Sequence, residues 1–406
     1  MTAGARSTAV TPAPGGAGRA AARAAVPVAG LLALVVLLVA FDPIGAITDA
    51  PPVEELAVER TVLTDGEIEL RVRNDGPDPV TVAQVIVNDA YWAHTVSDRT
   101  LTRLDTATVR VPYPWEEGLP LHIRMVSSTG ATFDHEIDVA TATPERDGRS
   151  LGVYALLGLA IGVVPVALGL LWLPSLRRVS ARWIAVALAF TVGLLAFLLV
   201  DTVDEGLELA GATGEALGGL ELFAVGALVV IVVLLAVESA TLRRSASGAA
   251  GEVRASGLSL AYLVAVGIGL HNLGEGLAVG AASARGAVAL GTALVVGFAV
   301  HNLTEGLAIA APLSEHGPAG GVSAGHLAGL VAVAGLPTVP GAWLGAYAFS
   351  PAWAALAFGV AAGAIAQVLW VVGRHLLATP DGRSGAAAAG FVVALVVMYV
   401  TGLAVV

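Results

Sequence analysis

Long apolar runs alternate with short polar stretches from Leu151 to the end of the chain. A helix that crosses a bilayer needs about 20 predominantly apolar residues. The eight runs of suitable length cover residues 151–173, 183–209, 218–240, 257–283, 287–312, 324–348, 351–373 and 386–405. The pattern therefore predicts a polytopic α-helical membrane protein, with an eight-helix bundle over residues 151–406.

The pattern changes between residues 55 and 142, where apolar and polar residues alternate one by one. The segments from Ile68 to Arg73 and from Leu121 to Met125 are clear examples. A period of two is typical of half-buried strands, and polar turns rich in Gly, Asn and Ser separate these segments. We predict a small antiparallel β-sandwich within a domain that spans residues 42–150.

The N-terminal part combines a basic, low-complexity stretch with one apolar run. Residues 1–25 are rich in Ala, Gly, Pro and Thr and carry three arginines, which predicts a disordered cytoplasmic tail. The run at 26–41 is short for a membrane span and long for the core of a signal peptide. We interpret it as a transmembrane anchor, with a cleaved signal segment as the alternative. Both interpretations place residues 42–150 outside the cell.

Arginines mark one side of the predicted bundle. They cluster after the first, third and seventh apolar runs, and positively charged loops tend to stay cytoplasmic. The clusters are Arg177, Arg178 and Arg182; Arg243, Arg244 and Arg254; and Arg374 and Arg383. Arg285, between the fourth and fifth runs, is the exception. This orientation places both ends of the bundle outside and predicts a multi-pass protein of the plasma membrane.

The composition narrows the possible chemistry. The chain is 56% hydrophobic and 13% charged, contains no cysteine, and its 21 basic residues are all arginine. Any metal must therefore be held by His, Asn, Asp or Glu. Residues 42–150 hold 20 of the 32 acidic residues but only 9 of the basic ones. Because this domain is acidic and the bundle is nearly neutral, we expect no nucleic-acid partner.

Two matching hexapeptides lie in the fourth and fifth apolar runs: His-Asn-Leu-Gly-Glu-Gly at 271–276 and His-Asn-Leu-Thr-Glu-Gly at 301–306. Residues i and i+4 share a helix face, so each histidine lies one turn from its glutamate. The copies are one crossing and a tight turn apart, so adjacent antiparallel helices bring them to the same depth. The candidate site residues are His271, Asn272, Glu275, His301, Asn302 and Glu305.

Carboxylates deep in a bilayer are costly and usually functional. Glu275 and Glu305 can offset the charge of a divalent cation, and imidazole favours Zn²⁺, Fe²⁺, Mn²⁺ or Co²⁺ over Mg²⁺ and Ca²⁺. The two asparagines can add carbonyl oxygens or orient waters. A single His-x-x-x-Glu pair could instead be an interhelical hydrogen-bonding pair, but its repetition favours a metal site.

The second apolar run carries a degenerate third copy, Asp-Thr-Val-Asp-Glu-Gly at 201–206. Asp201 takes the place of the histidine and Glu205 that of the glutamate. Because this run leads outward, Asp201, Asp204 and Glu205 lie in its outer half, where they could attract cations to the site. The alternative is a solvated helix end at the membrane interface.

At these residues the sequence resembles the ZIP family of divalent-metal transporters, especially its bacterial members. In that family the fourth and fifth of eight helices carry His-Asn-x-x-Glu-Gly-type motifs that build the transport site. The resemblance covers roughly residues 151–406. It implies two helix bundles that move against each other, often in a homodimer. It also implies that His271, Glu275 and Glu305 are primary ligands with His301 close by, and that Asn272 and Asn302 belong to a second subsite.

The chain departs from the family pattern at two places. Many members have proline before the motif glutamate, where this chain has Gly274 and Thr304. Bacterial members also tend to have a Glu-Pro-Leu-Gly-Ala-type stretch in the sixth helix, whose glutamate reaches the second subsite. Thr338 stands at that glutamate position. We therefore expect a single dominant metal site, and we expect Thr338→Glu to tighten binding or add a second ion.

Together these features predict a secondary transporter, not an enzyme, that moves a divalent transition metal into the cytoplasm. Zinc is the first candidate substrate, with iron and manganese as alternatives, and we expect no organic cofactor. ATP use is not expected, because a Gly-x-x-x-x-Gly-Lys-Ser/Thr loop needs lysine. One alternative is a membrane metal sensor that does not transport. Another is an intramembrane zinc hydrolase, although the His-Glu-x-x-His motif common in such enzymes is absent.

Overall fold

The computed structural model describes residues 29–34, 36–37, 52–246, 257–284, 288–314 and 322–402. Residues 29–34 and 36–37 are helical and lie in the apolar run at 26–41. The predicted tail at 1–25 lies outside the described residues. The segment Met1–Val53 forms one unit, and Glu54–Val406 forms a second.

Eight strands form two four-stranded antiparallel sheets, ordered β1-β2-β6-β5 and β4-β3-β7-β8. The strands are β1 (Leu56–Thr64), β2 (Glu67–Asn74), β3 (Val82–Val87), β4 (Ala90–Trp92), β5 (Thr95–Val96), β6 (Thr106–Val111), β7 (Leu121–Ser127) and β8 (Thr132–Ile137). A two-residue turn joins β1 to β2, and its Gly66 adopts a φ of 72° that favours glycine.

The alternation of side chains explains how the two sheets pack. In β7, Leu121, Ile123 and Met125 are buried while His122 and Arg124 are exposed, as a period of two requires. Apolar side chains from both sheets enter one shared core, so the sheets pack face to face. The predicted antiparallel β region is confirmed.

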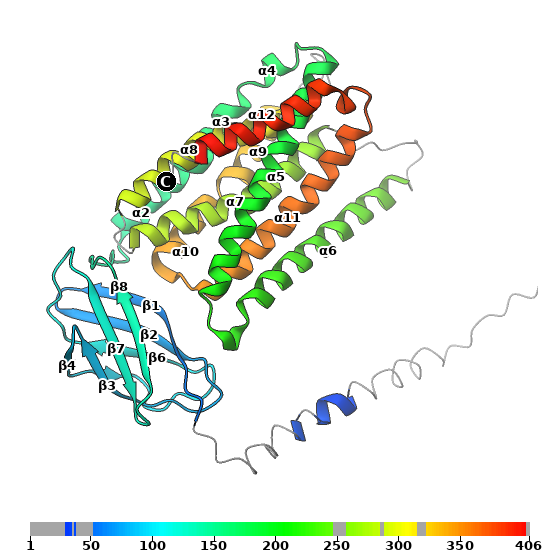
Figure 1. Cartoon of the computed structure of the whole chain (residues 1–406). Helices are drawn as coiled ribbons and strands as arrows, with labels where there is room; N and C mark the ends of the chain where they lie inside the picture. The colour runs from blue at the N-terminus through cyan, green and yellow to red at the C-terminus, as the bar shows by residue number, and fades with distance from the viewer. Residues whose placement is uncertain are drawn as a thin grey trace, which may run out of the picture. The chain divides into compact units, whose positions relative to one another are not determined.

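From Gly148 onward the described residues are mostly helical, and the helices run beside one another as a bundle (Figure 1). They are α2 (Gly148–Gly158), η2 (Leu159–Val163), α3 (Val164–Leu170), α4 (Leu173–Leu176), α5 (Ala181–Gly211), η3 (Glu215–Leu217), α6 (Gly219–Ala246), α7 (Gly257–Ala284), α8 (Val288–Ser314), α9 (Ala324–Gly335), α10 (Thr338–Ala348), α11 (Pro351–Leu377), η4 (Asp381–Arg383) and α12 (Gly385–Gly402). Within the described residues, eight helical segments are long and apolar enough to cross a membrane, which confirms the predicted number.

Two of the eight segments are interrupted, which the hydrophobic pattern did not predict. The first contains the π-helical turn η2, followed by Pro165 in the first turn of α3. Pro165 has no N–H to donate to the carbonyl of Ile161, four residues earlier. The sixth segment breaks at Leu336 and Pro337 into α9 and α10. Both breaks leave backbone carbonyls available to side chains from other helices.

Glycines divide the bundle into two sets of closely packed helices. In the first set, a Cβ on Gly276 of α7 would collide with the Thr338 carbonyl of α10, and one on Gly306 of α8 with the Val166 carbonyl of α3. In the second set, a Cβ on Gly193 of α5 would collide with α12, and one on Gly359 of α11 with α6. We call the helices α2–α3 and α7–α10 the ligand half, and α5, α6, α11 and α12 the supporting half.

The contacts between the two halves are of a different kind. Gly274 of α7 faces the ring of Phe358 on α11, which lies 2.9 Å from the position of an added Cβ. Gly267 of α7 likewise faces the side chain of Val368 on α11 at 3.0 Å. In the described part of the bundle, several glycines have an added Cβ that would collide with the backbone of another helix. In each case that helix belongs to the same half as the glycine. Backbone therefore meets backbone within each half, whereas side chains meet backbone between them.

Candidate metal centre

Neighbouring helices α7 and α8 bring the six predicted site residues together in the interior of the bundle. None is more than 6% exposed, and Asn272, Asn302 and Glu305 are fully buried. Each His-x-x-x-Glu pair lies along one face of its helix, because residues i and i+4 are stacked one turn apart. The close helix packing at Gly276 and Gly306 holds both motifs against their neighbours.

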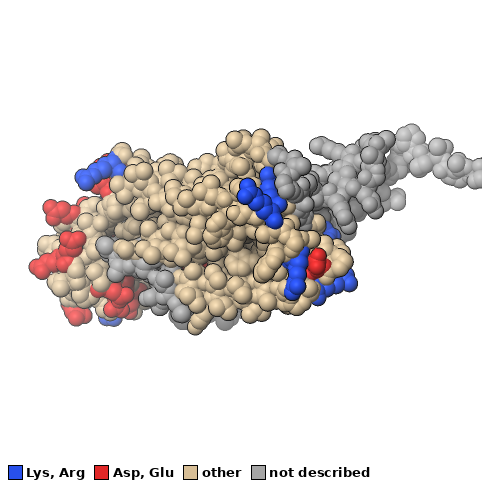
Figure 2. Space-filling model, turned by 90° about the horizontal axis from the view of Figure 1, so that it is seen from above, with Lys and Arg blue, Asp and Glu red and all other residues tan. Residues whose placement is uncertain are grey.

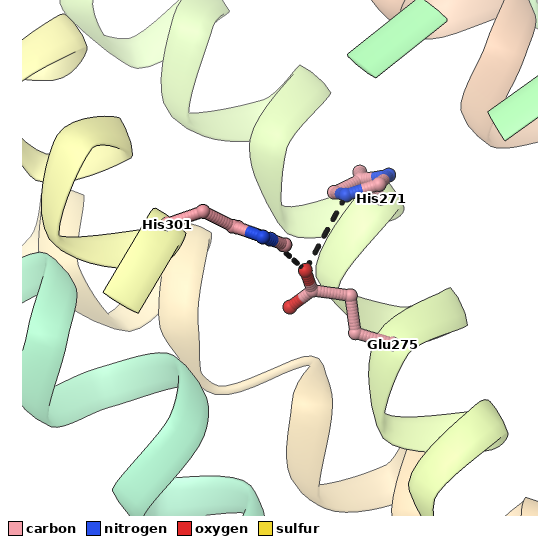
Figure 3. A group of neighbouring side chains, drawn as sticks. All are labelled: His271, Glu275 and His301. Carbon is pink, nitrogen blue, oxygen red and sulfur yellow. Dashed lines mark hydrogen bonds and ion pairs between the residues drawn. The ribbon is translucent and has the colours of Figure 1, made fainter. Parts of the chain in front are cut away.

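Glu275 is the centre of this group (Figure 3). Its Oε1 lies 3.5 Å from Nε2 of His271 and also contacts Nε2 of His301, so one carboxylate oxygen joins both imidazoles. The ligand atoms of these three residues all lie within 4.8 Å of one another. Among the described residues, they are the only group of three or more His, Cys, Asp or Glu side chains so close together.

The two asparagines link the motifs crosswise. Asn302 of α8 donates to Oε2 of Glu275 on α7 at 2.8 Å, and Asn272 of α7 donates to Oε2 of Glu305 on α8 at 3.1 Å. Each amide also donates its second hydrogen to a third helix. Each asparagine thus fixes the glutamate of the other motif.

The backbone acceptors of the asparagines lie at the two breaks in the helices. Asn302 donates to the carbonyl of Ile161 at 2.8 Å, the group that Pro165 leaves without its usual helical donor. Asn272 donates to the carbonyl of Ala334 at 3.0 Å, in the last turn of α9. The amides therefore satisfy backbone groups that would otherwise be buried without a partner.

Several potential metal ligands in this cluster have no hydrogen-bond partner among the described residues. They are Nε2 of His271, Oδ1 of Asn272, Oδ1 of Asn302 and Oε1 of Glu305. Buried polar atoms are normally paired, so a set without partners requires an explanation. Two carboxylates, two imidazoles and two amide oxygens suit a divalent transition metal, whose charge the carboxylates can balance.

Glu305 accepts a hydrogen bond from the Asn272 amide and is not one of the three residues whose ligand atoms lie within 4.8 Å of one another. Both imidazoles therefore contact Glu275, while Glu305 is joined to the group through Asn272. Sequence reasoning treated all four charged or imidazole residues as one set of ligands.

The acidic residues of the third motif copy face away from the core. Asp201, Asp204 and Glu205 are all exposed, whereas Thr202 and Gly206 of the same helix are buried. Their exposure agrees with either a path that attracts cations or a solvated helix end. The motif copy nevertheless reaches the site, because Oγ1 of Thr202 lies 2.9 Å from Nδ1 of His271.

Sequence reasoning missed Thr202 as a site residue. The signal that could have found it is the period of α5: Thr191, Leu195, Leu198, Thr202 and Gly206 are buried at helical spacing. On this face Thr202 is the polar residue level with the motifs. Sequence reasoning selected the charged residues Asp201, Asp204 and Glu205 of this motif copy instead.

Thr338 is fully buried at the start of α10, and its Oγ1 lies 2.6 Å from the carbonyls of both Gly158 and Gly335. A Cβ on Gly162 would collide with the Thr338 side chain. The threonine therefore fills a tight crossing between the first and sixth helical segments. This packing leaves no space for a glutamate unless the helices separate.

No family model matches the chain, and no curated protein matches it. Among solved structures, the archaellum periplasmic stator protein FlaG from Sulfolobus acidocaldarius is similar to part of the chain, at 13% identity and a TM-score of 0.19. The match covers 21% of this chain and 99% of that protein. So weak a likeness carries no argument, and the resemblance to the ZIP family rests on the motifs and their place in the fourth and fifth of eight apolar runs.

Proposed function

We propose that the chain is a multi-pass membrane transporter that moves a divalent transition metal, zinc first among the candidates, into the cytoplasm. The observation that carries this proposal is the buried group of His271, Glu275 and His301, set among eight apolar helical segments. Carboxylates at such depth are tolerable when a cation or a donor network balances them. The unpartnered ligand atoms nearby favour a cation.

The distribution of charge supports a membrane setting. Figure 2 shows one face of the molecule on which basic residues predominate towards one end and acidic residues at the other, with a broad band free of both between them. Arg177 and Arg178 follow α4, while Arg374 and Arg383 flank the end of α11. We take the basic end as cytoplasmic because positively charged loops tend to remain there.

The two halves of the bundle suggest how the ion could cross. All six candidate ligands and the two broken helical segments belong to the ligand half. Its helices contact one another backbone to backbone, whereas side chains separate it from the supporting half. Packed side chains can slide past one another by small shifts, but interlocked backbones move as one body. The site would therefore travel or tilt with the ligand half.

Acidic residues of α5 could form the outer end of the proposed ion route. Asp201, Asp204 and Glu205 are exposed within three residues of Thr202, which contacts the site. Negative charge raises the local concentration of cations. We propose that the ion reaches Glu275 past these carboxylates and leaves towards the arginine-rich end.

Flux through purified protein tests the proposal. The full chain, reconstituted in liposomes, is expected to give saturable uptake of Zn²⁺ and competition by Fe²⁺, Mn²⁺ or Cd²⁺, but not by Mg²⁺ or Ca²⁺. Tight binding without flux would favour the sensor. Metal-dependent cleavage of a substrate in detergent would favour the hydrolase. If the protein shows no Zn²⁺ binding and no Zn²⁺ flux, the metal assignment is wrong.

A further inference from the structure

The contact between Thr202 and His271 is a polar contact between a candidate ligand and the supporting half. Oγ1 of Thr202 on α5 lies 2.9 Å from Nδ1 of His271 on α7, and the two residues are 1% and 4% exposed. The other hydrogen bonds of the cluster join residues of the ligand half. The distance between Thr202 and His271 therefore depends on the position of one half relative to the other.

The contact also engages Nδ1 and leaves Nε2 as the imidazole nitrogen that faces Glu275. Nε2 of His271 points to Oε1 of Glu275 at 3.5 Å and has no hydrogen-bond partner among the described residues. If Nε2 is the ligand atom, Nδ1 must carry the proton and needs an acceptor. We propose that Thr202 is a positioning residue that supplies this acceptor when Nε2 binds the ion, and so holds the His271 ring in the orientation that turns Nε2 towards Glu275. This inference rests on the proposed transport function.

A hydroxyl suits this position better than other side chains of similar size. It accepts from Nδ1–H when Nε2 binds the ion, and it can donate to Nδ1 when Nε2 carries the proton instead. Valine has the same shape but neither ability. A carboxylate would add a third buried negative charge to a site whose two glutamates already match a divalent ion.

Because the hydrogen bond crosses between the halves, it is sensitive to their relative position. A hydrogen bond is lost when its heavy atoms separate by much beyond 3.5 Å, so a slide of about 1 Å would break this one. His271 would then lose the group that orients it, and its hold on the ion would weaken. The contact thus makes affinity high in the arrangement described here and lower after the halves move, which favours release.

Three variants of the full chain test the inference. Thr202→Val removes the hydroxyl and keeps the shape of the side chain, whereas Thr202→Ser keeps the hydroxyl and removes the methyl group. Thr191→Val is the matched control, because Thr191 is buried on the same face of α5 and bonds to the Ala187 and Ala308 carbonyls instead. We would measure Zn²⁺ binding by equilibrium dialysis in detergent, Zn²⁺ uptake in liposomes, and the ¹⁵N shifts of the labelled histidine rings, with His271→Gln to assign the signal.

We expect Thr202→Val to raise the Kd and the KM for Zn²⁺ by about ten-fold or more, as loss of groups that orient metal ligands does. The maximal rate should change little. The ¹⁵N shift of Nδ1 in His271 should change, because this nitrogen loses its hydrogen-bond partner. Thr202→Ser and Thr191→Val should remain close to the unmodified protein in each measurement.

Unchanged Zn²⁺ binding and unchanged ring shifts in Thr202→Val would overturn the inference. The transport proposal would still stand if the unmodified protein takes up Zn²⁺. If the unmodified protein neither binds nor transports Zn²⁺, the transport proposal fails and the inference fails with it. If Thr202→Val does not fold, Thr202→Ser decides: a ten-fold loss of affinity despite its hydroxyl would count against the role.

Discussion

The amide nitrogen of Asn302 lies 2.8 Å from Oε2 of Glu275, and Asn272 makes the reciprocal contact with Glu305. Each repeat thus holds the carboxylate of the other, and each amide is held in turn by a carbonyl at a break in a third helix. The asparagines therefore do more than complete a ligand set. They keep two buried carboxylates in place whether or not an ion lies between them.

Replacing Asn302 tests this role. Asn302→Asp keeps the size of the side chain but cannot donate to the Ile161 carbonyl, and it sets a negative charge against Glu275. We expect a loss of at least about 1–3 kcal/mol of stability, the usual cost of a buried polar group without its partner. Thermal unfolding in detergent with a chelator measures the loss. Ser283→Ala on α7 is the control and should leave the Tm nearly unchanged. An unaltered Tm in Asn302→Asp would contradict the bridging role.

The two glycines of the first motif should respond differently to alanine. Gly276→Ala places a methyl group against the Thr338 backbone, which cannot turn aside, so we expect about 1–3 kcal/mol of destabilisation from overpacking. Gly274→Ala meets only the Phe358 ring at 2.9 Å, which can rotate, and gains up to about 1 kcal/mol of helix propensity. Thermal unfolding of the two variants side by side makes the comparison. Equal losses would contradict the distinction between backbone packing within a half and side-chain packing between halves.

A glutamate at position 338 is the third test. The sequence favoured a gain of a second ion, but Thr338 fills a crossing where Gly158 and Gly162 lie against it. We now expect Thr338→Glu to separate the first and sixth helical segments and lower the Tm, with no second ion in anomalous scattering. Thr338→Ser, which keeps the hydroxyl, should retain the stability. A second ion with an unchanged Tm would restore the earlier expectation.

Much of the architecture could be predicted because hydrophobic period reports burial directly. The eight helical segments follow from apolar runs long enough to cross a membrane, and the strands around Ile68 and Leu121 follow from a period of two. The π-turn at Leu159–Val163 and the break at Pro337 were missed, since neither changes the apolar character of its run. Pro165 was a usable signal, because a proline inside a helix always leaves a carbonyl free four residues earlier.

The site was predictable in its members but not in its connections. The repeat of His-x-x-x-Glu indicated that His271 and Glu275 would meet their counterparts on the next helix. It could not indicate that the asparagines bond crosswise, because that depends on which backbone carbonyls the neighbouring helices leave free. Thr202 was missed because its contact depends on the rotation of α5, which turns the acids outward and the hydroxyl inward.

The role of Glu275 is the central claim, because its carboxylate joins both imidazoles and receives the Asn302 amide. The decisive measurement is Zn²⁺ uptake by liposomes that contain Glu275→Ala, beside the unmodified protein and Glu221→Ala, which removes an exposed carboxylate at the start of α6. We predict that saturable uptake is lost in Glu275→Ala and retained in Glu221→Ala, with equal amounts of folded protein in the membrane. Uptake by Glu275→Ala at the unmodified rate and KM would contradict the account.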